Sequence, residues 1–399
     1  MQTFTLLTRS PSALVAHLTR LQQSYAEHTL LFTLSPNAPP SVLSQLVQRL
    51  TSFSHTSLGC LSTPLPLADH LACSLLLFPP GTATPFRSSL PGRSTPQVGR
   101  WHAFRTKDDA PAAPTEPPAP DAQYTWAEIW ARNTQDTALP ESLHDLNPAD
   151  VSEVLYLTDR APEGLLNSLG AFPGATRLGL VAASTPFITG RPVTLFHNDK
   201  IHESGAVGLA LRRIPRGRAS TDFPGVVPIS APTTVTRCEG NMVNELNDTN
   251  PTQLLLRAIR ERKLDTDTSG SFKDNESFLL GTLHKGTVQQ MYSITAGDPS
   301  RGSISLASQT APVVGTQVQF FHRPKSLKLD VPAAASVPTI KFLSCAEVSS
   351  DAADAAVGDV VTVPNTFIGA SENGFVLSRP GEAAWTCTVA GGVASIEWA

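Results

Sequence analysis

The sequence is poor in charge and has no long apolar run. Charged residues make up 16% of its 399 residues, and 30 basic side chains against 34 acidic ones give a formal net charge of −4. A chain without a basic excess lacks the field that attracts nucleic acid, so we expect no nucleic-acid partner. The longest largely apolar run, residues 71–78, is much shorter than the roughly 20 residues of a membrane-spanning helix. We therefore expect no membrane span.

Cysteines are also too few and too scattered to form a disulfide framework. The chain has five of them, at Cys60, Cys73, Cys238, Cys345 and Cys387. An odd number without any C-x-x-C pair favours free thiols in a reducing compartment over disulfides or a zinc site. The sequence therefore predicts a cytoplasmic protein.

Acidic residues are nearly missing from the first 53 residues, where Glu27 is the only one. An arginine-bearing, acid-poor start is typical of a mitochondrial presequence, so the mitochondrial matrix is the alternative location. Leu14, Leu18 and Leu21 nevertheless recur at helical spacing ahead of a strand-like segment. This pattern favours the first helix of a domain.

Motifs for nucleotide binding and for metal-dependent hydrolysis are missing as well. The sequence contains no G-x-x-x-x-G-K-[ST], no H-E-x-x-H and no G-x-S-x-G, and no G-x-G-x-x-G follows a strand. His197 and His202 flank a turn, but sequence places no third ligand beside them. We expect neither a cofactor nor a metal.

What the chain does contain is an alternation of helical and strand patterns. Helical periodicity at 12–26 and 41–53 alternates with strand patterns at 29–34, 57–61 and 71–78. Strand and helix in alternation predict an α/β (α+β) fold, in which helices are layered on mixed β-sheets. Residues 79–122 are rich in proline and end in a stretch at 108–122 without apolar periodicity, so they are expected to be a loop insertion, with a short edge-strand pattern at 99–104.

Residues 194–260 mark the junction of two domains. Strand pairs are predicted on both sides of a proline-rich segment at 213–232. Asn250 is then a good N-cap, and Pro251 suits the first position of a helix.

Four phrases in this order resemble the FIST family, whose members carry a FIST-N and a FIST-C domain. The phrases are SGAVGLAL (204–211), VTRCEGNMVNEL (235–246), FLSCAE (342–347) and VPNTFIGASENG (363–374). The resemblance implies a FIST-N-like domain at 1–212, which carries the proline-rich insertion at 79–122. It further implies a linker at 213–232 and a FIST-C-like domain at 233–399.

The resemblance also points to a candidate ligand pocket. Relatives tend to carry a Gly-Arg pair after the cysteine that matches Cys345, whereas this chain has Ala346 and Glu347. Residues 369–374 resemble the family pattern G-x-x-x-N-G-E, with Asn373 in place, but Phe375 stands where the family has Glu. Glu372 lies close enough to substitute. The candidate ligand-binding residues are Cys345, Glu347, Glu372 and Asn373.

The resemblance implies a non-enzymatic protein of intracellular signalling that binds a small metabolite, a protein partner or both. Relatives joined to an F-box imply an alternative, a ubiquitin-ligase substrate adaptor lacking its own F-box. A structural subunit of an assembly, which could be mitochondrial, is another. An enzyme would be a Cys345-dependent hydrolase with His284 or His322 as base. Sequence does not identify the oligomeric state.

Overall fold

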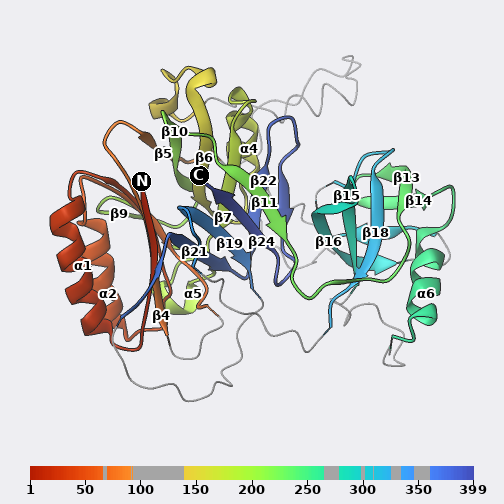
Figure 1. Cartoon of the computed structure of the whole chain (residues 1–399), viewed down its shortest axis with the longest axis horizontal. Coiled ribbons are helices and arrows are strands. Elements are labelled where there is room, and N and C mark those ends of the chain that lie inside the picture. The colour runs from red at the N-terminus through yellow and green to blue at the C-terminus, as the bar shows by residue number, and fades with distance from the viewer. Residues whose placement is uncertain are drawn as a thin grey trace, which may run out of the picture.

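The computed structural model describes residues 1–65, 70–90, 92, 139–264, 278–297, 302–308, 310–324, 334–345 and 360–399. Three sheets lie side by side in one part of the molecule, and a β-barrel lies beside them (Figure 1). Glu347 and most of the expected insertion at 79–122 fall outside the described residues. The mixed α/β class predicted from the sequence is confirmed.

The first sheet has seven strands in the order β20-β1-β4-β2-β3-β8-β9. Its strands are β1 (Gln2–Thr8), β2 (Thr29–Leu34), β3 (Thr56–Leu61), β4 (Leu71–Phe78), β8 (Leu195–His197), β9 (Lys200–His202) and β20 (Val361–Pro364). Helices α1 (Pro11–Tyr25) and α2 (Pro40–Thr51) cover its outer face (Figure 1). The acid-poor N-terminus thus forms a strand inside this sheet and a helix on it.

The second sheet has six strands in the order β23-β22-β7-β6-β10-β5. Its strands are β5 (Ala83–Ser88), β6 (Val151–Thr158), β7 (Thr176–Val181), β10 (Ala206–Arg212), β22 (Phe375–Ser378) and β23 (Trp385–Cys387). Helix α4 (Glu163–Ser168) packs on one face through Leu165. Residues 83–88, expected within the loop insertion, instead form edge strand β5, because their backbone pairs with β10 despite the proline at position 85.

A smaller central sheet lies between these two, in the order β11-β24-β19-β21. Its strands are β11 (Arg218–Asp222), β19 (Thr339–Ser344), β21 (Thr366–Ser371) and β24 (Val393–Glu397). Its edge strand β21 contacts β1 and β4 of the first sheet and β7 of the second. The three sheets therefore share one continuous core.

Side-chain hydroxyls of the first sheet complete the hydrogen bonding of the β21 edge. The N–H of Ile368 donates to Thr5 Oγ1 at 3.1 Å and to Ser74 Oγ at 3.2 Å. The carbonyl of Ile368 accepts from Ser74 Oγ at 2.7 Å and from Thr33 Oγ1 at 3.3 Å. Because these groups are buried, leaving them unpaired would cost free energy.

Ser74→Ala is expected to lower the free energy of unfolding by about 1–3 kcal/mol, since it leaves the Ile368 backbone short of a buried partner. Ser44→Ala, at an exposed position of α2, is the control and should change stability by about 0.5 kcal/mol or less. Chemical denaturation of both variants checks this. Equal, small effects would contradict the bridging role of Ser74.

Six of the remaining strands close into a barrel. They follow the order β18-β13-β14-β17-β16-β15, and β15 pairs back to β18. The strands are β13 (Thr233–Glu239), β14 (Met242–Leu246), β15 (Phe278–His284), β16 (Thr287–Gly297), β17 (Ile304–Leu306) and β18 (Gln317–His322). Helix α6 (Pro251–Glu261) begins as predicted, with Asn250 Oδ1 accepting from the Gln253 N–H at 3.0 Å.

Strand pairing joins the two expected domains. Strand β20 pairs with β1, β22 pairs with β7, and β11, within the expected linker, pairs with β24. The chain enters the barrel through β12 (Val227–Pro228) and leaves it after β18. Among the described strands, the barrel strands and β12 pair only with one another. The division at 213–232 stays a prediction.

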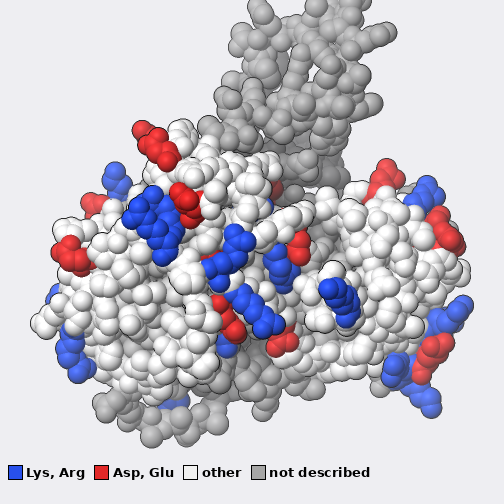
Figure 2. Space-filling model, turned by 45° about the horizontal axis from the view of Figure 1, so that its top comes forward, with Lys and Arg blue, Asp and Glu red and all other residues white. Residues whose placement is uncertain are grey.

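Charged side chains of both signs lie interspersed on the face shown in Figure 2, and most of that face is uncharged. None of the helices in the described part of the chain is both long and apolar enough to cross a membrane.

Candidate functional site

Three pairs of parallel strands, one in each sheet, end at the same place. The pairs are β2 with β3, β6 with β7, and β19 with β21. Backbone bonds join these strand ends: the Thr63 N–H donates to Ala370 O at 2.9 Å, the Cys345 N–H donates to Ser371 O at 3.0 Å, and the Ala183 N–H donates to Leu61 O at 3.3 Å. The carboxyl ends of parallel strands are where α/β sheets commonly place ligand sites.

Glu372, in the turn between β21 and β22, is held from two other strand ends. Its carboxylate accepts a short hydrogen bond from the Thr63 hydroxyl, and its Oε1 accepts from the Ser184 N–H at 2.7 Å. Thr63 also accepts from the Glu372 N–H at 3.0 Å. One carboxylate thereby ties together the ends of β3, β7 and β21.

These hydrogen bonds determine the charge of Glu372. Burial favours the neutral acid, but the bonds from Thr63 and Ser184 outweigh it, so the pKa of Glu372 lies below its usual value. The group is therefore an anion at neutral pH.

Asn373 and Arg160 extend this network. The Asn373 amide Nδ2 donates to Ala182 O at 2.9 Å and to Glu372 Oε1 at 3.1 Å. Arg160 donates from Nη2 to the Ser184 hydroxyl at 2.9 Å. Hydrogen bonds thus hold the side chains of Arg160, Glu372 and Asn373 beside the carboxyl ends of the parallel strands.

Arg160, Glu372 and Asn373 form one side of a cleft of about 750 Å³ between the sheets and the barrel. The same side includes Pro162, Glu163, Leu166 and Val181, while residues 382–386 and Thr388 of the β22–β23 hairpin and its flank form a second wall. The barrel supplies the third wall through residues 282–284, Gln289, Gln290, Tyr292, Ala307, Ser308, 310–313 and Thr316. A cleft of this size suits a small organic molecule.

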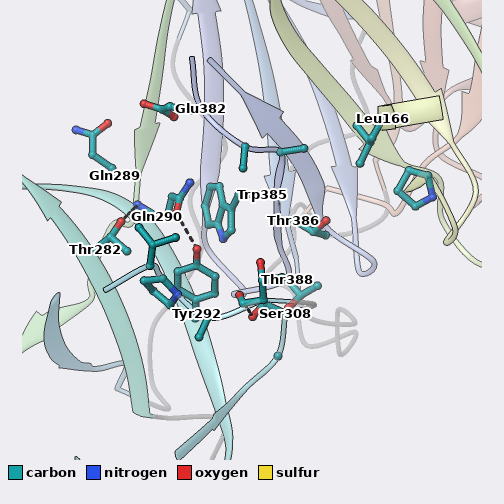
Figure 3. Close-up of a pocket in the computed structure, with 18 of the residues that line it drawn as sticks. Leu166, Thr282, Gln289, Gln290, Tyr292, Ser308, Glu382, Trp385, Thr386 and Thr388 are labelled. Atoms are coloured by element: carbon teal, nitrogen blue, oxygen red, sulfur yellow. Dashed lines mark hydrogen bonds between the residues drawn. The ribbon is translucent and has the colours of Figure 1, made fainter. Parts of the chain in front are cut away.

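An aromatic cluster closes the cleft between the hairpin and the barrel. Trp385, only 4% exposed, packs edge-to-face on Tyr292 with ring centroids 6.2 Å apart and on Phe375 at 5.8 Å. Figure 3 shows the Trp385 and Tyr292 rings beside each other, with Gln290 hydrogen-bonded to the tyrosine hydroxyl. The hairpin and the barrel therefore meet through these two rings.

Cys345 lies next to this network but is not part of the cleft lining. It is 3% exposed, and burial together with the neighbouring Glu372 charge raises the pKa of its thiol to about 12. A protonated, buried thiol is a poor nucleophile.

Cys345 is expected to resist alkylation by iodoacetamide at neutral pH, reacting at least ~100-fold more slowly than the half-exposed Cys238. Peptide mass spectrometry of the folded chain after timed labelling would measure both rates. Comparable labelling of the two thiols would contradict this placement of Cys345. Unfolding in denaturant should remove the difference.

The structure brings together three of the four residues predicted from the sequence, namely Cys345, Glu372 and Asn373, and it does not describe Glu347. Phe375, where the family pattern has Glu, is fully buried in the aromatic cluster. The remaining members of the network, Thr63, Arg160 and Ser184, were not predicted, because each follows a different strand and carries no motif.

The two histidines considered as a base for Cys345 lie on barrel strands, His284 at the end of β15 and His322 at the end of β18. His284 lines the barrel side of the cleft, and His322 packs against Phe278 with ring centroids 5.4 Å apart. Burial is the main reason why the pKa values of His197 and His202 are lowered. Within the described ranges, no three His, Cys, Asp or Glu side chains gather in a way that could hold a metal.

Comparison with known families identifies part of the chain. Residues 144–249 match the family model of the FIST N domain, which suggests a sensory domain of signal transduction. The match begins ahead of β6 and runs past the expected linker into the barrel, through β14. It does not include a FIST-C domain and gives no support for an F-box association. No curated protein matches the chain.

Proposed function

We propose that this chain is a non-enzymatic sensory protein that binds a small molecule in the cleft between the sheets and the barrel. The observation that carries the proposal is the cleft itself, which is lined by three separate parts of the fold and fixed at one side by the Glu372 network. The match of residues 144–249 to the FIST N domain supports a sensory role.

A ligand in this position would contact the sheets and the barrel at the same time. Such a ligand stabilises one arrangement of the two parts over others, because it gains contacts only when both are in place. This differential binding is what a sensor needs in order to report its ligand to a partner. The signal that a partner reads would then be the position of the barrel relative to the sheets.

A thermal-shift screen of metabolites tests the proposal with two tryptophan substitutions. Ala384→Trp fills the cleft from the exposed hairpin, while Ala16→Trp adds the same side chain at an exposed position of α1. At a concentration of about 100 times its dissociation constant, a ligand stabilises a protein by about 2.7 kcal/mol. We expect at least one compound to raise the melting temperature of the native chain and of Ala16→Trp, but not of Ala384→Trp.

No stabilising compound, or equal stabilisation of all three proteins, would contradict the proposal. Circular dichroism of the unliganded variants checks that Ala384→Trp is folded.

Catalysis through Cys345 is disfavoured by the buried, high-pKa thiol and by the adjacent Glu372 anion. All five cysteines are free thiols, which supports a reducing compartment, the cytoplasm or alternatively the mitochondrial matrix.

Binding of a protein partner is a second candidate, favoured by Phe187. This side chain is fully exposed on the short helix α5 (Pro186–Thr189), and the Thr185 hydroxyl anchors that helix to Thr194 at 2.7 Å. Aromatic residues, phenylalanine among them, are enriched in protein–protein interfaces. Phe187→Ser should release a partner that co-purifies with the native chain, and an unchanged partner set would contradict this second role.

A further inference from the structure

The proposed cleft also indicates which chemical class of ligand it takes. Resting on the proposed function, we propose that the Trp385–Tyr292 end of the cleft recognises an uncharged carbonyl group, such as a carboxamide, attached to an apolar body. Three observations lead to this assignment. Within the described part of the chain, the indole N–H of Trp385 has no hydrogen-bond partner, the Gln290 amide is oriented with its NH₂ group free, and the charged side chains of the lining already have partners.

The unused donor is the indole N–H of Trp385. The atom Nε1 is buried and has no hydrogen-bond partner among the described residues. A buried donor without a partner costs about 1–3 kcal/mol, which a ligand oxygen would recover on binding. Only an acceptor can satisfy it, because the indole nitrogen does not accept hydrogen bonds.

A second donor lies on the opposite wall. The Tyr292 hydroxyl donates to Gln290 Oε1 at 2.7 Å. Because the amide oxygen of Gln290 is used in this way, its NH₂ group is the end left for a ligand. Figure 3 shows Gln290 and Trp385 on either side of the tyrosine hydroxyl. An oxygen that enters here meets donors from both the barrel and the hairpin.

The charges of the cleft disfavour an anionic oxygen. Glu163, Glu372 and Glu382 line it, against the single arginine Arg160, which is already bonded to Ser184. A carboxylate or phosphate would lie near the Glu372 anion, with Arg160 as the only arginine or lysine of the lining, so an uncharged carbonyl is the better acceptor.

Two of these carboxylates, Glu372 and Glu382, are already engaged and are not available to bind an ammonium group. Glu372 accepts hydrogen bonds from Thr63, Ser184 and Asn373. Glu382 is paired with Arg379 at 3.2 Å. A cationic ligand would have to displace these partners, whereas an uncharged one would not.

Access to the indole couples binding to movement. Nε1 is closed off where Trp385 packs on Tyr292, so a ligand oxygen reaches it only when the two rings move apart. Trp385 belongs to the hairpin and Tyr292 to the barrel. A carbonyl that binds between their rings therefore moves the hairpin and the barrel apart. The apolar body then rests on Pro162, Leu166 and Val181 of the sheet side.

Three small probes of nearly equal shape test the charge preference: benzamide, benzoate and benzylamine. Ligand-observed NMR titrations of the full chain are expected to show benzamide binding at least about 10-fold more tightly than either charged probe. Trp385→Phe keeps the aromatic packing but removes the N–H, and it should weaken benzamide about 5- to 10-fold. Ala384→Trp should abolish binding, and Ala16→Trp should leave it unchanged.

Several results would overturn this inference. They are tighter binding of benzoate or benzylamine, no benzamide binding at millimolar concentration, or equal affinity of benzamide for a folded Trp385→Phe variant. If a metabolite without a carbonyl stabilises the native chain but not Ala384→Trp, the ligand class is wrong and the proposed function stands. If neither benzamide nor any metabolite distinguishes Ala384→Trp from Ala16→Trp, both are wrong.

Discussion

Glu372→Ala is expected to lower the free energy of unfolding by about 3 kcal/mol, because it removes charge-assisted hydrogen bonds that are each worth about 1.5–3 kcal/mol. The Ser184 N–H and the Thr63 hydroxyl would both lose their acceptor. Since these groups come from the ends of two different sheets, the loss weakens the junction between them. The variant should therefore bind cleft ligands less tightly as well.

The effect of this substitution should depend on pH. The pKa of Glu372 is lower in the folded chain than its usual value, although burial alone would raise it. A group of this kind contributes stability above its unfolded pKa and loses it as the pH falls through the folded pKa. The stability difference between the native chain and Glu372→Ala should therefore shrink in acid.

Chemical denaturation at neutral and acidic pH measures both effects. Glu382→Ala serves as the control, because Glu382 is an exposed carboxylate of the same cleft, and it should cost about 0–1 kcal/mol. Equal costs for the two substitutions, or a Glu372 effect that does not depend on pH, would show that the network does not hold the strand ends together.

Trp385→Ala is expected to cost about 3–5 kcal/mol, as is usual when a large buried aromatic side chain is truncated. Trp385 packs against Phe223, Tyr292 and Phe375. Its removal would leave a cavity where the hairpin meets the barrel. We expect lower cooperativity of unfolding in addition to lower stability, because the contact between the two parts is lost.

Phe187→Ala is the matched control for this large-to-small change. Phe187 is fully exposed, so its truncation should change stability by about 0.5 kcal/mol or less. Denaturant unfolding followed by circular dichroism compares the two variants. A cost below about 1 kcal/mol for Trp385→Ala would show that the barrel is not supported by this cluster.

Local structure was predictable from the sequence where local chemistry specifies it. The strand at 71–78 and the helix capped by Asn250 lie where the patterns place them. Strand β1 was missed although Thr3, Phe4, Thr5 and Leu6 alternate as in a strand, because the start of the chain was considered only as a presequence or as the first helix. Strand β5 was missed because proline usually argues against a strand, yet an edge position tolerates it.

The assembly of the sheets was not predictable from a single sequence. Strands β20 and β22, late in the chain, pair with β1 and β7, and the barrel closes by pairing β15 with β18. Such pairings depend on contacts between residues tens to hundreds of positions apart, which local periodicity does not record. For the same reason the resemblance located Glu372 and Asn373, but Arg160 and Trp385 became visible only in the fold.

The proposed function requires one small-molecule site that spans the sheets, the hairpin and the barrel. Hydrogen exchange, measured with and without the low-molecular-mass fraction of a cell extract, tests it directly. With the ligand fraction, we expect slower exchange in three segments together, residues 159–166, 278–292 and 382–388. Exchange in α1 and α2 should be unchanged, and Ala384→Trp should show no protection. Unchanged exchange, protection confined to one of the three walls, or the same protection in Ala384→Trp would contradict it.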